Sequence, residues 1–308
     1  SSDVCSSDLL QSANENNRPT CVVYLDQSAA FDKCDFGRIG EMLHQSGITG
    51  KTGQYIKEWL TNRTQSVIVN EVITTPSPVT SGVPQGSKLA PFIFILYVAP
   101  MVTHLRSTIK QYADDITLTC FADDQSEVRN MEQDTEDIFL WGQERGLVFN
   151  PTKSCHIIYG NNHLPINPSM GGVPISRSDR TKDLGILFTQ NLKFTEHIND
   201  AAQKAIMKTN LVFRNVRTKN TKILVKIYQT YIQSSLLYGS IIFSSHYSSL
   251  NARLNRVFNH FWRRAGCRPP PTLLNPYEMT IVNDLKYCKR IWDKKTDLNF
   301  YQIGRAHV

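Results

Sequence analysis

The stretch Gln111-Tyr112-Ala113-Asp114-Asp115-Ile116-Thr117-Leu118 decides the fold and the chemistry of this chain. It places two adjacent acids between short runs of residues that favour strands, so it predicts a hairpin with the acids at its tip. Neighbouring carboxylates on a rigid turn suit Mg²⁺, a hard cation that prefers oxygen ligands and keeps positions open for water or phosphate. A metal pair would need a further acid from elsewhere in the chain.

Composition indicates a folded protein, and its positive charge is compatible with an anionic partner. Of the 308 residues, 41% are hydrophobic and 10% aromatic, which is enough for one or two domains and excludes a disordered chain. The 34 Lys and Arg residues leave a net charge of +7. This charge favours nucleic acid as a partner, although a solvated basic surface would produce it equally well.

Cysteine spacing and hydropathy favour a soluble, intracellular protein without a membrane partner. The seven cysteines fall singly, with no C-x-x-C pair, which favours a reducing compartment and offers no zinc site. The longest apolar run, Pro91–Pro100, is far shorter than the roughly 20 residues of a membrane helix, and no signal peptide opens the chain.

The two ends of the chain look foreign. Residues 4–9 and 303–307 can be encoded by one DNA sequence read in opposite orientations, as in a translated sequencing adapter. We expect residues 1–9 and 303–308 to be an adapter-like scar outside the fold, and the rest to be a fragment of a longer protein.

A further acid ends an early apolar run. Cys21–Leu25 has the pattern of a buried strand, and Asp26 follows it directly. Because an acid at the end of a buried strand is costly unless it is paired or used, Asp26 is the candidate partner for the pair at the hairpin tip.

The rest of the chain predicts a mixed first part and a helical last part. Two glycines flank Gln85 in Ser81–Ser87, which allows close approach of a ligand to the backbone, although such turns are common. The expected strands are a hairpin around Asn70-Glu71, Cys155–Tyr159 and Leu184–Phe188, and the expected helices are 51–61, 90–105, 126–145, 195–217, 221–242 and 247–265.

Five of these segments occur in a familiar order, at residues 25–32, 82–87, 112–115, 150–154 and 184–186. Together they resemble the reverse transcriptase of non-LTR retrotransposons, and the nearest type is that of the jockey and CR1 LINE elements. The resemblance runs from about residue 18 to at least 265. Four residues such as Tyr-Ala-Asp-Asp occur in many proteins, whereas the ordered series is specific.

The resemblance implies an α+β fold of the right-hand polymerase class. A palm of mainly antiparallel sheet with flanking helices would span residues 10–190, and an all-helical thumb would span 191–265. Residues 266–302 would form a connecting region. The family also carries fingers before the Asp26 strand, and we expect them to be missing or truncated here, so that the fragment by itself would be inactive.

The resemblance also assigns the chemistry. Asp26, Asp114 and Asp115 match the acids that bind two Mg²⁺ ions, with Mn²⁺ as an alternative, for in-line transfer of a nucleotide to a primer 3′ hydroxyl. Asp26 and Asp114 lie 88 residues apart (114 minus 26), so they can share that pair only if their strands are neighbours. The structural alternative is that Asp26, Asp114 and Asp115 are surface or capping carboxylates.

Other matches concern substrates. Phe31 would exclude a ribose 2′ hydroxyl, Lys153 would serve as a catalytic proton donor or phosphate contact, and Gly185 would let the primer backbone approach. Gln85, Gly86 and Tyr112 would contact the incoming nucleotide and template. Asp32 would be structural, bonded to nearby backbone. An ordinary core Phe31 and a solvated Lys153 are the structural alternatives.

A basic run in the helical part would track nucleic-acid phosphates, or would only be a solvated face. It comprises Lys204, Lys208, Arg214, Arg217, Lys219, Lys222 and Lys226. The implied partners are an RNA template, a DNA primer and deoxynucleotides, in a nuclear or cytoplasmic ribonucleoprotein. The alternatives are an inactive element product that only binds nucleic acid, a group II intron maturase relative and a viral RNA polymerase.

Overall fold

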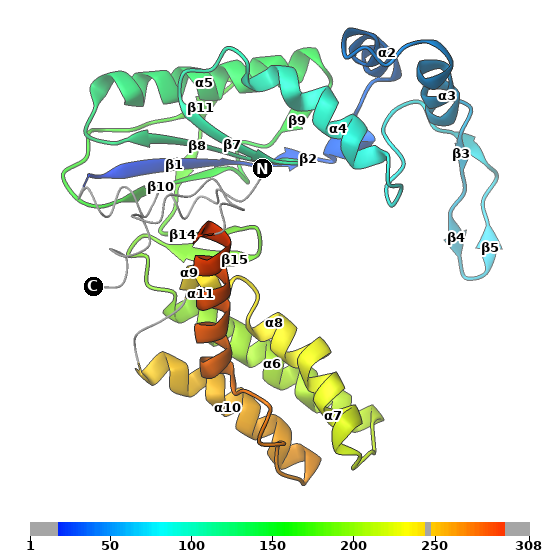
Figure 1. The fold of residues 1–308 in the computed structure, drawn as a ribbon. Coiled ribbons are helices and arrows are strands. Elements are labelled where there is room, and N and C mark those ends of the chain that lie inside the picture. Colours follow the sequence, from blue (N-terminus) through cyan, green and yellow to red (C-terminus); the bar gives the residue numbers. More distant parts are fainter. Residues whose placement is uncertain (1–17, 244–247, 293–308) are drawn as a thin grey trace. The chain divides into compact units, whose positions relative to one another are not determined.

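The structure, a computed structural model, describes residues 18–243 and 248–292. The adapter-like ends and residues 293–302 of the expected connecting region lie outside these residues. The chain forms two compact units that divide between Ser178 and Asp179. Both units contain helices and strands, so the chain has the predicted mixed α+β composition (Figure 1).

A five-stranded sheet in the order β13-β10-β1-β8-β7 organises the first unit. All neighbours are antiparallel except β10 and β13. Helix α5 covers one face of the sheet, where Val128, Met131 and Ile138 join the buried residues of β1 and β8 in one core (Figure 1). The bounds are β1 Thr20–Leu25, β7 Thr108–Tyr112, β8 Asp115–Phe121, α5 Gln125–Glu144, β10 Cys155–Tyr159 and β13 Ser176–Arg177.

A second core in this unit is helical. Ile39, Leu60 and Phe94, each from a different helix, are almost fully buried together. The helices are η1 Ala30–Asp32, α2 Phe36–Gln45, α3 Gly50–Leu60, α4 Ala90–Val98 and η2 Ala99–Val102. The predicted helix 90–105 was therefore too long, because Pro100 has no N–H to continue the α-helical pattern.

Short strand pairs complete the first unit. The hairpin predicted around Asn70-Glu71 is present, and both turn residues have positive φ, at 49° and 67°. The pairs are β2 Gln27–Ser28 with β9 Val148–Phe149, β3 Thr64–Gln65 with β6 Ser77–Pro78, β4 Ile68–Val69 with β5 Val72–Ile73, and β11 Ser169–Met170 with β12 Val173–Pro174.

The second unit opens with a hairpin and continues with helices. Its core gathers Leu224, Tyr228, Phe261 and Trp262 among other buried residues. The elements are β14 Arg180–Asp183, β15 Ile186–Thr189, α6 Thr195–Asn215, α7 Thr221–Ile227, the π-helix η3 Tyr228–Gln233, α8 Ser234–Leu236, α9 Ser240–Phe243, α10 Ser248–Ala265 and α11 Pro276–Trp292.

Two predictions for this unit were wrong in detail. Leu184 and Gly185 lie in a turn, with φ of 43° and 87°, rather than in a strand, because Asp183 pairs with Ile186 across a two-residue hairpin loop. The helix expected over 221–242 is interrupted by the π-helix and by Gly239, whose φ is 70°. Helix α11 lies within the expected connecting region, and its Asn283 Nδ2 donates to Ser240 Oγ of α9 at 3.0 Å.

Candidate active site

The acids meet at one edge of the sheet. Strands β1 and β8 are antiparallel neighbours, and Leu25 lies opposite Ile116. Asp26 follows Leu25 and Asp115 precedes Ile116, so both acids lie at the same end of adjacent strands. Asp114 and Ala113 form the two-residue loop between β7 and β8, and Ala113 takes the left-handed φ of 55° that such a tight loop requires. The neighbour relation that a shared metal pair demands is therefore present.

The carboxylates of Asp26 and Asp114 lack protein partners. Within residues 18–243 and 248–292, neither accepts a hydrogen bond or joins an ion pair, and both residues are half-buried. Their oxygens are the donor type that Mg²⁺ prefers. The same described residues contain no ready-made group of three or more His, Cys, Asp or Glu side chains that could hold a metal ion.

The backbone of Asp26 is held by the turn at Asn150–Ser154. The Asp26 N–H donates to Ser154 Oγ at 3.0 Å, and the Asp26 carbonyl accepts from the Asn150 N–H at 2.9 Å. The side chain of Lys153, in the same turn, is exposed. Ser154 was only part of a motif in the sequence; its burial, with 1% of its surface exposed, marks it as a support of the site.

The loop Ser81–Ser87 packs directly on η1. The Gly82 N–H donates to the Cys34 carbonyl and the Val83 N–H to the Phe31 carbonyl, both at 2.8 Å. A Cβ on Gly82 would lie 2.7 Å from the Asp32 Cα, so only glycine fits this approach. Arg63, which the sequence reasoning missed, donates to the Gly82 carbonyl at 2.6 Å, and burial lowers its pKa.

The role expected for Asp32 needs correction. Its carboxylate Oδ1 accepts a bond from the Gln85 amide nitrogen at 2.9 Å, and its carbonyl accepts from the Ser81 hydroxyl at 2.9 Å. Only its N–H bonds to nearby backbone, donating to the Ala29 carbonyl at 3.0 Å. Asp32 therefore fixes the orientation of the Gln85 amide. Asp32 and Gln85 belong to two local motifs and are 53 positions apart in the chain, so local sequence rules could not reveal that they meet.

Gln85 borders an open hollow of about 450 Å³. The hollow is lined by Asp32, Arg63, Thr64, Gln65, Val79, Ser81, Gly82, Val83, Pro84 and Gln85. Gly86, with φ of 86°, has open space where a Cβ would stand, so this side of the loop is accessible. Phe31 is half-buried, and its ring stacks on Phe94 with centroids 4.4 Å apart, which fixes the ring in place.

In the second unit, Gly185 lies under an aromatic side chain. Tyr238 Oη donates to the Leu184 carbonyl at 3.0 Å, and a Cβ on Gly185 would lie 3.3 Å from the Tyr238 ring. Within the first unit, Tyr112 is 58% exposed beside the acids. Gly185 and Tyr112 are both exposed, and the Tyr238 ring covers one side of Gly185.

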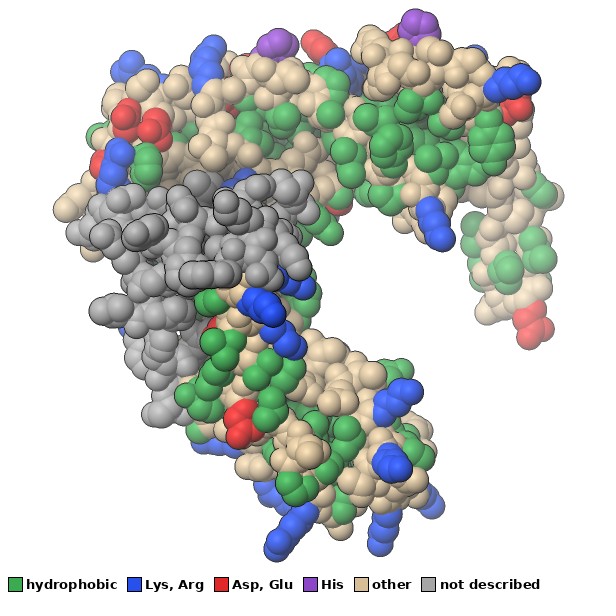
Figure 2. All heavy atoms as spheres, viewed as in Figure 1, with side chains coloured by type: hydrophobic (Ala, Val, Ile, Leu, Met, Phe, Trp, Pro, Cys, Tyr) green, Lys and Arg blue, Asp and Glu red, His purple; other side chains and the backbone are tan. Residues whose placement is uncertain are grey.

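All seven residues of the predicted basic run are exposed. Lys204 shares an ion pair with Asp200 at 2.6 Å. Figure 2 shows Lys and Arg side chains gathered at the end of the second unit formed by α6, α7 and α10. The surface formed by the seven residues is called the basic face below.

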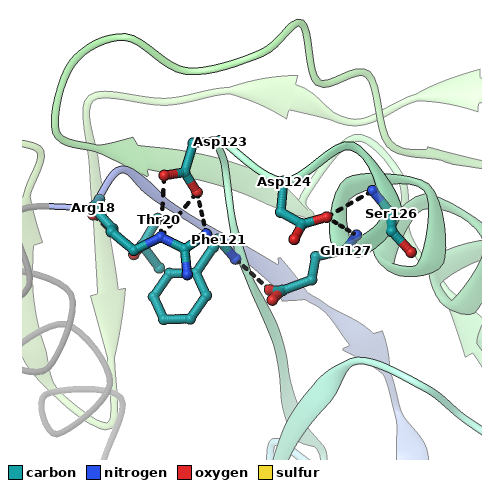
Figure 3. Close-up of polar contacts among 7 residues, drawn as sticks. All are labelled: Arg18, Thr20, Phe121, Asp123, Asp124, Ser126 and Glu127. Atoms are coloured by element: carbon teal, nitrogen blue, oxygen red, sulfur yellow. Dashed lines mark hydrogen bonds and ion pairs between the residues drawn. The ribbon is translucent and has the colours of Figure 1, made fainter.

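At the opposite end of the sheet, the acids are hydrogen-bonded to other protein groups (Figure 3). Arg18 donates to the Asp123 carboxylate, with the shortest contact at 2.6 Å, and this hydrogen bond lowers the pKa of Asp123. The Arg18 guanidinium also lies 3.9 Å from the centre of the Phe121 ring. Asp124 caps α5 by accepting from the N–H groups of Ser126 and Glu127. These acids are engaged in holding structure.

Comparison with known families identifies the family of this chain. A family model described as reverse transcriptase (RNA-dependent DNA polymerase) matches residues 2–195, more than half of the chain. The chain therefore belongs to the reverse transcriptase family, and the resemblance found in its five motifs is confirmed.

Curated relatives come from fly retrotransposons. The probable RNA-directed DNA polymerase from transposon X-element of Drosophila melanogaster is 24% identical over 216 residues, covering 66% of this chain and 24% of that protein. The RNA-directed DNA polymerase from mobile element jockey of the same species is 26% identical over 219 residues, covering 66% and 23%. The chain thus spans about a quarter of the length of these relatives.

Telomerases are among the solved structures that align with this chain. Apo telomerase from Candida tropicalis aligns with a TM-score of 0.45 at 8% identity, covering 92% of this chain and 47% of that one. Telomerase from Candida albicans in complex with a TWJ fragment of telomeric RNA gives a TM-score of 0.40 at 12% identity, covering 96% of this chain and 53% of that one.

In the described residues of this chain, no helix is long and apolar enough to cross a membrane.

Proposed function

We propose that this chain carries the palm and thumb of an RNA-directed DNA polymerase that adds deoxynucleotides to a primer 3′ hydroxyl on an RNA template. The observation that supports this most directly is the position of Asp26 and Asp115 at the same end of adjacent strands, with Asp114 in the turn between β7 and β8. In this proposal, the palm of a right-hand polymerase spans residues 10–190, and the helices within 191–265 form its thumb.

Asp26, Asp114 and Asp115 would hold two Mg²⁺ ions, or Mn²⁺ in their place. Bound there, the ions would supply activation of the primer hydroxyl and stabilisation of charge on the leaving pyrophosphate. Carboxylates repel one another at short range, so such a set need not be gathered before a cation binds. Neither Asp26 nor Asp114 has a protein partner among the described residues, which supports this role. By contrast, Asp123 and Asp124, which serve the structure, accept hydrogen bonds from protein groups.

The neighbouring residues would select and align the nucleotide. Gln85, oriented by Asp32, leaves its amide oxygen able to accept a hydrogen bond from a base or sugar. Phe31, held by its stack on Phe94, would act as a rigid wall against a 2′ hydroxyl. Gly86 and Tyr112 present accessible surface to substrate, Lys153 would contact or protonate pyrophosphate, and the turn at Gly185 would approach the primer backbone.

Primer extension tests this proposal. The assay compares the chain, a longer version carrying the upstream fingers segment of its relatives, and Asp114→Ala in each, on an RNA template with Mg²⁺. We expect the longer version to extend the primer and Asp114→Ala to abolish extension. Asp123→Asn is the matched control, because it neutralises an acid at the other end of the same sheet and should leave extension intact. Extension that survives Asp114→Ala would refute the metal assignment.

A binding-only protein is the second candidate, and the exposed basic face favours it. Binding through phosphates predicts that log Kd changes linearly with log salt concentration, with a slope of about 0.7 for each phosphate contact to a single strand. Replacing Lys219 and Lys222 by Gln should lower this slope by about 1 to 2, whereas Lys286 and Lys289 of α11 serve as the control pair. Salt-sensitive binding without extension by either version would favour this candidate.

A further inference from the structure

The pairing of β1 with its two neighbouring strands ends just before Asp26. The last paired residues of β1 are Tyr24, opposite Cys155 of β10, and Leu25, opposite Ile116 of β8. Asp26 is the next residue, and β2 follows it at Gln27, which pairs with Phe149 of β9. The Asp26 N–H and carbonyl therefore lie at the junction of two strand pairings and need partners of their own.

A closed ring of hydrogen bonds holds the backbone of Asp26. The Asp26 N–H donates to Ser154 Oγ at 3.0 Å, the Ser154 hydroxyl donates to the Asn150 carbonyl at 2.9 Å, and the Asn150 N–H donates to the Asp26 carbonyl at 2.9 Å. The Ser154 hydroxyl is donor and acceptor at once, which only a hydroxyl side chain of this size can provide. Ser154 has 1% of its surface exposed, so water cannot readily replace it.

The turn that supplies Ser154 is itself rigid. Asn150 Oδ1 accepts from the Thr152 N–H at 3.0 Å and from the Lys153 N–H at 3.3 Å, and the Asn150 carbonyl accepts from the Ser154 N–H at 3.0 Å. Strand β10 begins at the next residue, Cys155. The position of Asp26 is therefore tied to the turn that carries Lys153, and not only to its own strand.

We infer that Ser154 is a positioning residue that sets the affinity of the acidic edge for a divalent cation by fixing the backbone of Asp26. This inference rests on the proposed function, because it concerns the same cation site. Groups that support metal ligands typically change metal affinity or activity 10- to 100-fold when removed. Ser154→Ala removes both bonds of the hydroxyl, whereas Ser154→Thr keeps the hydroxyl.

The experiment measures Mn²⁺ binding to the full chain by electron paramagnetic resonance, alongside thermal unfolding. We expect Ser154→Ala to weaken Mn²⁺ binding at least about tenfold, and Ser154→Thr to restore most of it. Thr135→Val is the matched control: Thr135 is fully buried in α5, and its hydroxyl donates to the Met131 carbonyl at 2.7 Å. This variant should unfold at a lower temperature without weakening Mn²⁺ binding.

Two different failures can be told apart. If Ser154→Ala binds Mn²⁺ as the unchanged chain does, while Asp26→Ala does not, the cation site stands and the role of Ser154 is refuted. If the unchanged chain binds no Mn²⁺, or Asp26→Ala binds it equally well, the cation site itself is refuted and the inference falls with it. Should Ser154→Thr not fold, an equal loss of binding in Thr135→Val and Ser154→Ala would also overturn the inference.

Discussion

The two ends of the five-stranded sheet use the same residue type for opposite purposes. At the end where Thr20 pairs with Phe121, Asp123 binds Arg18 and Asp124 caps α5 (Figure 3). The buried Asp134 accepts from the N–H groups of Arg106 and Ser107, just before β7. At the end where Leu25 pairs with Ile116, Asp26 and Asp114 have no protein partner among the described residues. The acids at the first end bind protein groups, and we propose that Asp26 and Asp114 at the second end bind a cation.

This contrast teaches how to distinguish the roles of acids in one domain. A carboxylate whose oxygens accept backbone or guanidinium bonds lowers the free energy of the folded state, and its removal is felt as instability. A carboxylate without such bonds adds little to stability, so its removal should leave the free energy of unfolding nearly unchanged. Variants at the two ends should therefore separate stability from activity.

The largest effect is expected for Asp114→Asn. Primer extension by the longer version described above should fall at least about a thousandfold, because the substitution removes a negative ligand needed where charge develops in the transition state. The unfolding midpoint should stay nearly unchanged. A variant that unfolds readily but retains extension would reverse the contrast between the two ends.

A large effect on stability is expected for Asp134→Ala. Its Oδ2 accepts from the Arg106 N–H at 2.9 Å, the Ser107 N–H at 2.7 Å and Ser107 Oγ at 2.6 Å, so removal should cost about 2–3 kcal/mol. Urea denaturation monitored by circular dichroism measures the change. Asp137→Ala, on the same helix with one partner, Gln133, is the control and should change stability little.

A smaller effect is expected for Asp124→Ala. Loss of the side chain that caps α5 should destabilise the first unit by about 1 kcal/mol, while Asp124→Asn should retain most of the stability because an amide oxygen also caps. The same denaturation experiment tests both variants. Equal losses for Ala and Asn would mean that charge near the helix start, and not the hydrogen bond, matters at this position.

The smallest effect concerns pH. The Arg18 hydrogen bond holds the pKa of Asp123 below its ordinary value of 3.8, so the folded state binds this proton less readily than the unfolded state. The contribution is present above the ordinary pKa and is lost as pH falls through the lowered pKa. Asp123→Asn should thus be slightly less stable than the unchanged chain at neutral pH, and this gap should close in acid.

A gap that persists in acid would mean that Asp123 stabilises the sheet by packing and not by its charge. A double-mutant cycle with Arg18→Met isolates the pair. The coupling should be small, because both side chains are more than a third exposed and solvent screens the pair.

Much of the site could be predicted from local patterns. Strand-forming residues around Asp114-Asp115 predict the hairpin, and the run Cys21–Leu25 predicts a strand that ends on Asp26; both are confirmed as β7, β8 and β1. The Leu184–Phe188 run misled the prediction, because an apolar pattern does not show that Gly185 turns the chain with a positive φ. No local sequence pattern predicts the π-helix at Tyr228–Gln233. Its Tyr228 packs on Phe258 and Phe261, which lie far away in the chain.

The sequence by itself determined which residues could do chemistry: the acidic pair, Asp26, Gln85 between glycines, and the order of motifs that places the chain in its family. Only the tertiary structure decided which of them meet. Strand pairing between β1 and β8, the bond from Gln85 to Asp32, and the ring through Ser154 all join residues far apart in the chain. Such contacts depend on how the whole sheet and its loops pack, because the free energy that selects them comes from burial and hydrogen bonding across the fold and not from any local preference.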